Sequence, residues 1–200
     1  MLKKVVVLTA LLMSCFAVGA MAAEGPYFSG NLGITMPTDS DVSDGGFSAE
    51  ISYDAGFAIG GALGYNFGVG RLEAELGYKT ADIDEVSANG LGSASVNGDL
   101  SVLSLMGNGY FDFNLNPTVK PYVMAGIGMA NVTLDSNDLD VDDSDSVFAY
   151  QVGAGVGFAL NKKVTLDISY RYMGTEDAKI DGVDVEYGSH NILAGVRVQF

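Results

Sequence analysis

The sequence predicts an all-β chain that closes into an eight-stranded antiparallel up-and-down transmembrane β-barrel. The clearest indication is the segment 148–158, where apolar residues with an aromatic ring at each end alternate with Gln, Gly and Ala. Ten residue steps of about 3.3 Å, tilted by about 40°, rise roughly 25 Å, which matches the apolar band of such a barrel. Segments of this kind recur eight times, and the connectors between them alternate between long and short.

The eight predicted strands are stretches in which apolar residues occupy every second position. They cover residues 27–36, 51–65, 71–80, 100–113, 122–133, 147–160, 164–173 and 188–200. Three connectors are short turns, and four are much longer: 37–50, 81–99, 134–146 and 174–187. Alternate connectors of a meander lie at the same end, so the long loops are expected on one side and the chain termini on the other. An open edge cannot be solvated in hydrocarbon, so the first strand is expected to pair with the eighth.

Strand 71–80 determines which face of the predicted barrel points inward. Arg71, Glu73 and Glu75 alternate there with Leu72 and Leu76. A cation that faces lipid at the bilayer midplane costs about 2–4 kcal/mol, so the charged set is expected inside, where carboxylates can pair with it. The same parity places a further set of polar residues in the interior: Asp54, Asn108, Asp112, Gln151, Asp167, Arg171 and Arg197.

Eight strands enclose a lumen that side chains fill, and buried charges persist when they are paired. We therefore expect a salt-bridge network in the lumen, with Arg71 and Asp112 as a diagonal pair. Its predicted members are Arg71, Glu73, Glu75, Asp112, Asp167, Arg171 and Arg197. The alternative for the same residues is a gated path for protons or ions. Glycine-rich pieces such as 60–64 and 153–157 are interpreted as room for these side chains rather than as phosphate loops, because no helix follows them.

Residues 1–22 have the pattern of a secretory signal peptide, which leaves residues 23–200 as one barrel domain. Two lysines precede an apolar run, and Ala20-Met21-Ala22 offers small residues for cleavage. Cys15, the single cysteine, lies inside this segment, so we expect a mature domain without disulfides. Lipoprotein processing at Cys15 is the alternative.

Charge is strongly unbalanced in this chain, which has 25 Asp and Glu against 10 Lys and Arg. The four long connectors hold 19 of these acidic residues, whereas Lys120, Lys162 and Lys163 fall at the opposite end with the short turns. We therefore expect a strongly acidic surface at the end with the long loops. Nucleic acid is not expected as a partner, because the sequence has no basic patch to neutralise phosphates.

The connector 134–146 is the one segment that suggests a metal. It carries six aspartates within eleven residues, and Ca²⁺ prefers carboxylate oxygens. Asp138, Asp140 and Asp142 are the candidate ligands, but the glycine and the final glutamate of an EF-hand loop are absent from this segment. The simpler interpretation is a solvated acidic loop, so we expect no resident metal and no cofactor.

Three segments resemble the small outer-membrane β-barrel family that includes the opacity proteins and the transmembrane domain of OmpA-like proteins. They are residues 104–113, residues 120–123 with Gly126 and Gly128, and residues 190–200. The resemblance implies a Gram-negative outer membrane, with extracellular loops and periplasmic termini. It also implies that the terminal Phe200 is recognised by the barrel assembly machinery. Other implied partners are outer-membrane lipid, lipopolysaccharide and a host or surface ligand that the loops bind.

The function expected from these features is a structural or surface-interaction role, adhesin-like or opacity-like, in a monomer that is neither an open porin nor an enzyme. The alternatives are a narrow channel for ions or small solutes and an outer-leaflet lipid-modifying enzyme. Such an enzyme would need His190, the single histidine, but adjacent Ser189 points to the opposite face of the strand, so His190 is expected at the membrane interface. A secreted lipocalin-like carrier would reverse the two faces of every strand.

Overall fold

The structure is described for most of the chain beyond residue 23. In this computed structural model the described residues are 24–38, 40–44, 47–88, 92–94, 98–113, 118–136, 141–176, 178–180, 183–185 and 187–200. Most of them lie in β-strands. Across these ranges, no helix is long and apolar enough to cross a membrane.

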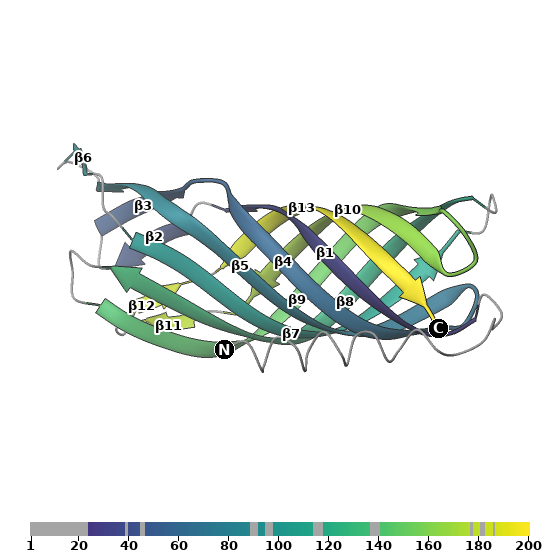
Figure 1. The fold of residues 1–200 in the computed structure, drawn as a ribbon. Helices are drawn as coiled ribbons and strands as arrows, with labels where there is room; N and C mark the ends of the chain where they lie inside the picture. Colours follow the sequence, from purple (N-terminus) through teal and green to yellow (C-terminus); the bar gives the residue numbers. More distant parts are fainter. Residues whose placement is uncertain are drawn as a thin grey trace, which may run out of the picture.

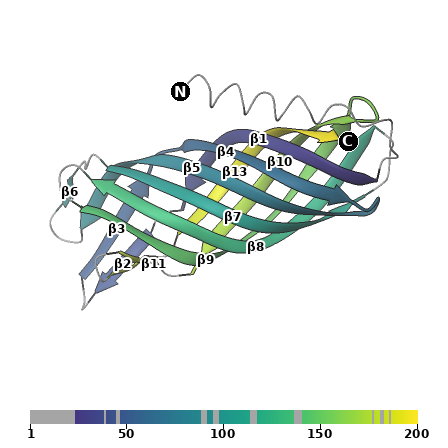
Figure 2. The same ribbon diagram turned by 60° about the horizontal axis from the view of Figure 1, so that its bottom comes forward.

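Eight strands form a closed antiparallel ring, which confirms the predicted barrel (Figure 1, Figure 2). In order around the ring they are β1 (Gly25–Pro37), β4 (Gly56–Asn66), β5 (Gly70–Ala88), β7 (Gly98–Asp112), β8 (Val119–Ser136), β9 (Val141–Ala159), β10 (Val164–Thr175) and β13 (Gly188–Gln199). β1 pairs with both β4 and β13, and β5 pairs with both β4 and β7. The first and last strands therefore meet, as the need to satisfy their backbone groups requires.

Tight turns lie at one end of the ring, which we call the short-turn end. The Asn66 side-chain oxygen accepts a hydrogen bond of 2.8 Å from the backbone N–H of Gly68, whose φ of 97° suits glycine. The Asn161 side-chain oxygen accepts hydrogen bonds from the backbone N–H groups of Lys163 (2.8 Å) and Val164 (2.9 Å). Asparagine thus shapes the β4–β5 and β9–β10 turns in the same way.

The long connectors contain strands that were not predicted from the sequence. β2 (Ser40–Asp44), β3 (Phe47–Tyr53), β6 (Gly92–Ala94), β11 (Ala178–Ile180) and β12 (Val183–Val185) lie at the end away from the short turns (Figure 1). We call this the long-connector end. β5, β8 and β9 have 19, 18 and 19 residues, so at about 2.5 Å of rise per tilted residue they extend far past an apolar band of roughly 25 Å. The connectors are therefore largely continuations of the sheet.

The predicted strand 51–65 is wrong as a single element. β3 and β4 are separated by two residues, and the pairing of β3 with β5 shifts register between Ser52 and Tyr53. Asp54, which was expected inside the lumen, lies in this break and is exposed, with its backbone N–H donating to the Asp82 carbonyl at 3.1 Å. A bulge interrupts the alternation of faces, so the parity of β4 does not extend to Asp54.

The outer wall of the barrel is apolar, and the inner face carries the charged residues of β5. Leu63, Leu105 and Ile127 are 69%, 61% and 63% exposed, whereas Arg71 and Glu75 are buried. The prediction that apolar side chains face outward and charged side chains face the lumen is therefore confirmed. A soluble lipocalin-like carrier would have the opposite arrangement.

Aromatic rings mark the two limits of this apolar wall. At the short-turn end, ring contacts join Tyr65 with Phe67, Phe111 with Phe113, and Phe28 with Phe200. Nearer the long-connector end they join Tyr150 with Tyr172, and Tyr170 and Tyr172 with His190. Two such girdles are typical of a barrel whose apolar band spans a bilayer.

Substitution of Leu105 by Arg tests this sidedness. Because Leu105 lies between the girdles, we expect Leu105→Arg to lower the free energy of unfolding in lipid vesicles by about 2–4 kcal/mol. Val69→Arg is the matched control, since Val69 is 60% exposed in a turn and its replacement is expected to cost about 0–1 kcal/mol. Denaturant titration of the refolded protein measures both values, and equal costs for the two variants would contradict the assignment.

Candidate functional site: the packed lumen

Arg71 of β5 is the centre of the charged layer inside the barrel. Its Nε lies 2.8 Å from Oδ2 of Asp112, and its Nη2 lies 3.0 Å from Oδ1. The ladder pairs Arg71 with Tyr110, so Asp112 of β7 is the diagonal neighbour that the sequence indicated. The Arg71 guanidinium carbon also lies 4.1 Å from the ring centroid of Tyr110 and 4.8 Å from that of Tyr122. Two-point pairing and cation–π contact together hold this side chain in one orientation.

Glu73 receives its hydrogen bonds from tyrosines. Oε1 accepts from the hydroxyl of Tyr27 at 2.6 Å, and Oε2 accepts from that of Tyr110 at 2.7 Å. Arg71 Nη1 lies 3.6 Å from Oε1 and adds a third favourable contact. Neither tyrosine was predicted as a partner, because charge pairing alone does not identify hydroxyl donors, although the alternation of β1 and β7 places both rings inward.

The other predicted lumen residues form two further ion pairs. Arg171 Nη1 donates to Glu75 Oε2 at 2.7 Å, and Arg197 Nη2 donates to Asp167 Oδ1 at 3.4 Å. Arg171 Nη2 also lies 3.5 Å from the Tyr110 hydroxyl, which links this pair to the cluster around Glu73. The structure thus brings all seven residues into the lumen as three neighbouring groups.

Lys79 is a fourth cation in the lumen, where the alternation of β5 places it, but it was not among the expected members of the network. Its Nζ lies 2.7 Å from the thioether sulfur of Met173 on β10. With Lys79, four basic side chains accompany the four acidic ones of the network in the described lumen. The layer is therefore close to electrically neutral, which lowers the cost of removing these charges from water.

An apolar layer, which the alternation pattern did not predict, packs in the lumen toward the long-connector end. This layer is a cluster of buried side chains: Leu100, Val102, Met106, Ala130, Val132, Val147, Ala149, Met173 and Tyr187. The sequence does contain a signal for this layer: consecutive apolar residues at 102–103, 105–106 and 147–148. Adjacent residues of a strand point to opposite faces, so one member of each pair must face the lumen. The lumen therefore has two layers, ionic near the short turns and apolar beyond them.

Glycines 153, 155 and 157 of β9 provide the volume that the ionic layer occupies. A Cβ built on Gly155 would lie 2.5 Å from Cζ and Oη of Tyr122, and one built on Gly153 would lie 3.0 Å from Cγ of Arg171. A Cβ on Gly157 would lie 3.2 Å from Nη2 of Arg197. Gly153 and Gly157 thus make room for arginines of the network, and Gly155 makes room for Tyr122, whose ring contacts Arg71, in agreement with the packing interpretation of this motif.

His190 lies at the membrane-facing side of the wall, as expected for an interfacial residue. Its Nδ1 is 2.6 Å from the Tyr170 hydroxyl, and the two rings stack at 5.9 Å. Ser189 is fully buried on the lumen side, where its hydroxyl accepts a hydrogen bond of 3.2 Å from the Asn191 amide. The two side chains point to opposite faces of β13, so they do not form a nucleophile and base.

The candidate calcium ligands are placed in part. Asp138 and Asp140 lie outside the described residues, and Asp142 is described through its backbone, which pairs with Asp135 across β8 and β9. In the portion of the chain that the structure describes, no group of three or more His, Cys, Asp or Glu could hold a metal.

A double-mutant cycle tests the energetic role of the Arg71–Asp112 pair. Arg71→Met leaves buried carboxylates without their cation, and we expect it to lower the free energy of unfolding by about 3–5 kcal/mol. Arg71→Met combined with Asp112→Leu should be more stable than Arg71→Met alone, because the second substitution removes an unpaired charge. Denaturant unfolding in detergent micelles measures the cycle, and simple additivity of the two single variants would show that the pair is not coupled.

Comparisons with known proteins agree with this geometry. Residues 8–200 match a family described as the outer membrane protein beta-barrel domain. The outer membrane protein PagN of Salmonella typhimurium is 26% identical over 229 aligned positions, which cover 94% of this chain and 95% of PagN. A candidate adhesin of Rickettsia conorii is 27% identical over 176 positions, which cover 78% of this chain and 68% of that protein.

Two solved structures are similar in fold. Neisserial surface protein A superposes with a TM-score of 0.59 at 24% identity, over 88% of this chain and 97% of that one. The outer membrane protein OprG from Pseudomonas aeruginosa has a TM-score of 0.51 at 15% identity, with the same coverage of 88% and 97%. These likenesses extend over nearly the whole barrel.

Proposed function

The chain belongs to the outer membrane protein beta-barrel domain family, and we propose that it is a surface-interaction protein with an adhesin-like or opacity-like role. In this proposal four acidic connectors are displayed outside the cell, and the barrel anchors them in the outer membrane. The observation that carries the proposal is the filled lumen. Its ionic and apolar layers occupy the barrel axis, so the parts available to a partner are the two ends.

The length of the strands supports a role for the long-connector end. β8 and β9 remain paired as far as Ser136 and Val141, well past the aromatic girdle that contains Tyr150. A paired hairpin projects a connector away from the membrane at a smaller entropic cost than a flexible loop does. The likeness to a candidate adhesin of Rickettsia conorii supports the same role.

Several finer features belong to this proposal. Residues 1–22 would be removed as a signal peptide, and the barrel of residues 23–200 would place its termini in the periplasm. Phe200, whose ring centroid lies 5.7 Å from that of Phe28, would be recognised by the barrel assembly machinery. Lipopolysaccharide would surround the outer girdle, and the ring of paired strands, which leaves no free edge among the eight, favours a monomer.

Replacement of each long connector tests the surface role. We expect cells whose connector 134–146 or 174–187 is exchanged for a neutral Ser-Gly linker of equal length to attach less to cultured epithelial cells. The physical reason is that recognition depends on the exposed connectors, whereas folding depends on the barrel. Exchange of the short turn 161–163 is the control and should leave attachment unchanged. Heat-modifiable migration verifies folding, and unaltered attachment after exchange of all four connectors would contradict the proposal.

Conductance measurements test whether the lumen is closed. We expect the purified protein to give no steady unit conductance in planar bilayers, because an apolar layer repels water and ions. Substituting Val102, Met106 and Val132 by Gly removes part of this layer and provides the comparison. Regular current steps from the wild-type barrel would instead support a narrow ion or solute channel.

A further inference from the structure

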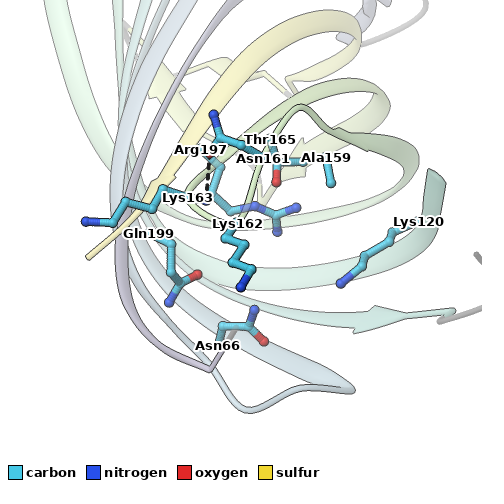
Figure 3. A pocket seen from close by; sticks show the side chains of 9 residues that line it. All are labelled: Asn66, Lys120, Ala159, Asn161, Lys162, Lys163, Thr165, Arg197 and Gln199. Carbon is cyan, nitrogen blue, oxygen red and sulfur yellow. Dashed lines mark hydrogen bonds between the residues drawn. The ribbon is translucent and has the colours of Figure 1, made fainter. Parts of the chain in front are cut away.

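A cavity of ≈ 370 Å³ opens into the lumen at the short-turn end, and the proposed surface role does not use it. Its lining comes from the ends of β4, β9 and β13, the β9–β10 turn, and the starts of β8 and β10. Figure 3 shows the nine side chains that line it. The cavity therefore combines residues from widely separated parts of the chain at one mouth of the barrel.

The charge of this lining is opposite to that of the chain as a whole. The chain has 10 Lys and Arg against 25 Asp and Glu, yet four of those basic residues line this one cavity: Lys120, Lys162, Lys163 and Arg197. None of the nine lining residues in the described part of the chain is acidic. Such a concentration of one sign of charge, in a recess with low-dielectric walls, attracts anions.

Arg197 provides a buried anion-binding group at the inner side of the cavity. The residue is 7% exposed, and its hydrogen bond to Asp167 is long, at 3.4 Å. A guanidinium has five N–H donors in a planar fork, so this bond leaves donors available toward the cavity that Arg197 lines. An arginine fork suits two oxygens of one phosphate group.

Two lysines lie on the same side of the cavity as this fork. In Figure 3 the side chains of Lys120 and Lys162 point into the open mouth, and Asn66 and Gln199 lie beside them. The Lys163 side chain extends away from this space, although it belongs to the same turn as Lys162. Two ammonium groups and one guanidinium thus face a common volume.

We propose that this cavity binds a phosphate group. The arrangement suits an anion with several oxygens and more than one negative charge, because the cavity is lined by three cations that face the same volume. The phosphate can come from the headgroup of an anionic phospholipid in the adjacent leaflet or from a soluble phosphorylated compound. The site is separate from the long connectors, so it does not depend on the proposed surface role.

The test uses the full refolded barrel and two phosphate probes. In the first arm, inorganic pyrophosphate is titrated by calorimetry into the protein in non-ionic detergent at low ionic strength. In the second, native mass spectrometry counts the phosphatidylglycerol and phosphatidylcholine molecules retained from mixed micelles. Lys120→Gln combined with Lys162→Gln removes the two ammonium groups that face the cavity. Lys163→Gln is the matched control, because it changes the same charge in the same turn but points away.

We expect saturable binding of pyrophosphate, or selective retention of phosphatidylglycerol, that the double variant weakens at least about tenfold and Lys163→Gln changes less than about twofold. Binding in the first arm alone identifies a soluble phosphate compound as the ligand, and retention in the second alone identifies the lipid headgroup. The proposal is wrong if neither probe binds saturably, or if Lys163→Gln loses as much affinity as the double variant. Far-UV circular dichroism and heat-modifiable migration establish that all variants are folded.

Discussion

The structure depends on one constraint: polar groups inside a narrow closed ring have little access to bulk water, so their burial is costly unless other groups of the ring pair with them. The backbone meets this constraint when β1 pairs with β13 and closes the sheet. Arg71 and Glu73 meet it through Asp112 and two tyrosine hydroxyls. The fold and the ionic layer are therefore two consequences of the same requirement.

The constraint is met differently at the two heights of the lumen. Near the short turns, opposite charges neutralise one another, whereas toward the long connectors a cluster of apolar side chains forms much of the lining and needs no hydrogen-bond partners. Lys79 lies where the two layers meet, because its ammonium group contacts Met173, a member of the apolar cluster. The apolar layer thus isolates the charges from the long-connector end, and the mouth at the short-turn end is where the ionic layer adjoins an open cavity.

Sequence periodicity predicted the site where the pleat is regular and failed where it is not. The inward position of Arg71 and its diagonal partner Asp112 follow from strict alternation in β5 and β7. Asp54 was misplaced because a register shift lies beside it, and a single sequence does not reveal a bulge. The apolar layer was missed because alternation was assumed to mean one polar face along the whole strand. The extra strands of the connectors depend on pairing between distant segments, such as β3 with β5, which composition cannot specify.

The three lumen arginines differ in how completely their donors are used. Arg71 has short hydrogen bonds to both oxygens of Asp112 and a further acidic neighbour, Glu73. Arg171 has one short bond to Glu75 and a long one to Tyr110, whereas Arg197 has a long bond to Asp167. Arg197 is the one of the three that lines the cavity at the short-turn mouth, so the arginine with a single long hydrogen bond lies where the lumen opens. A network built to neutralise charge internally therefore ends in a cation that is available to an external anion.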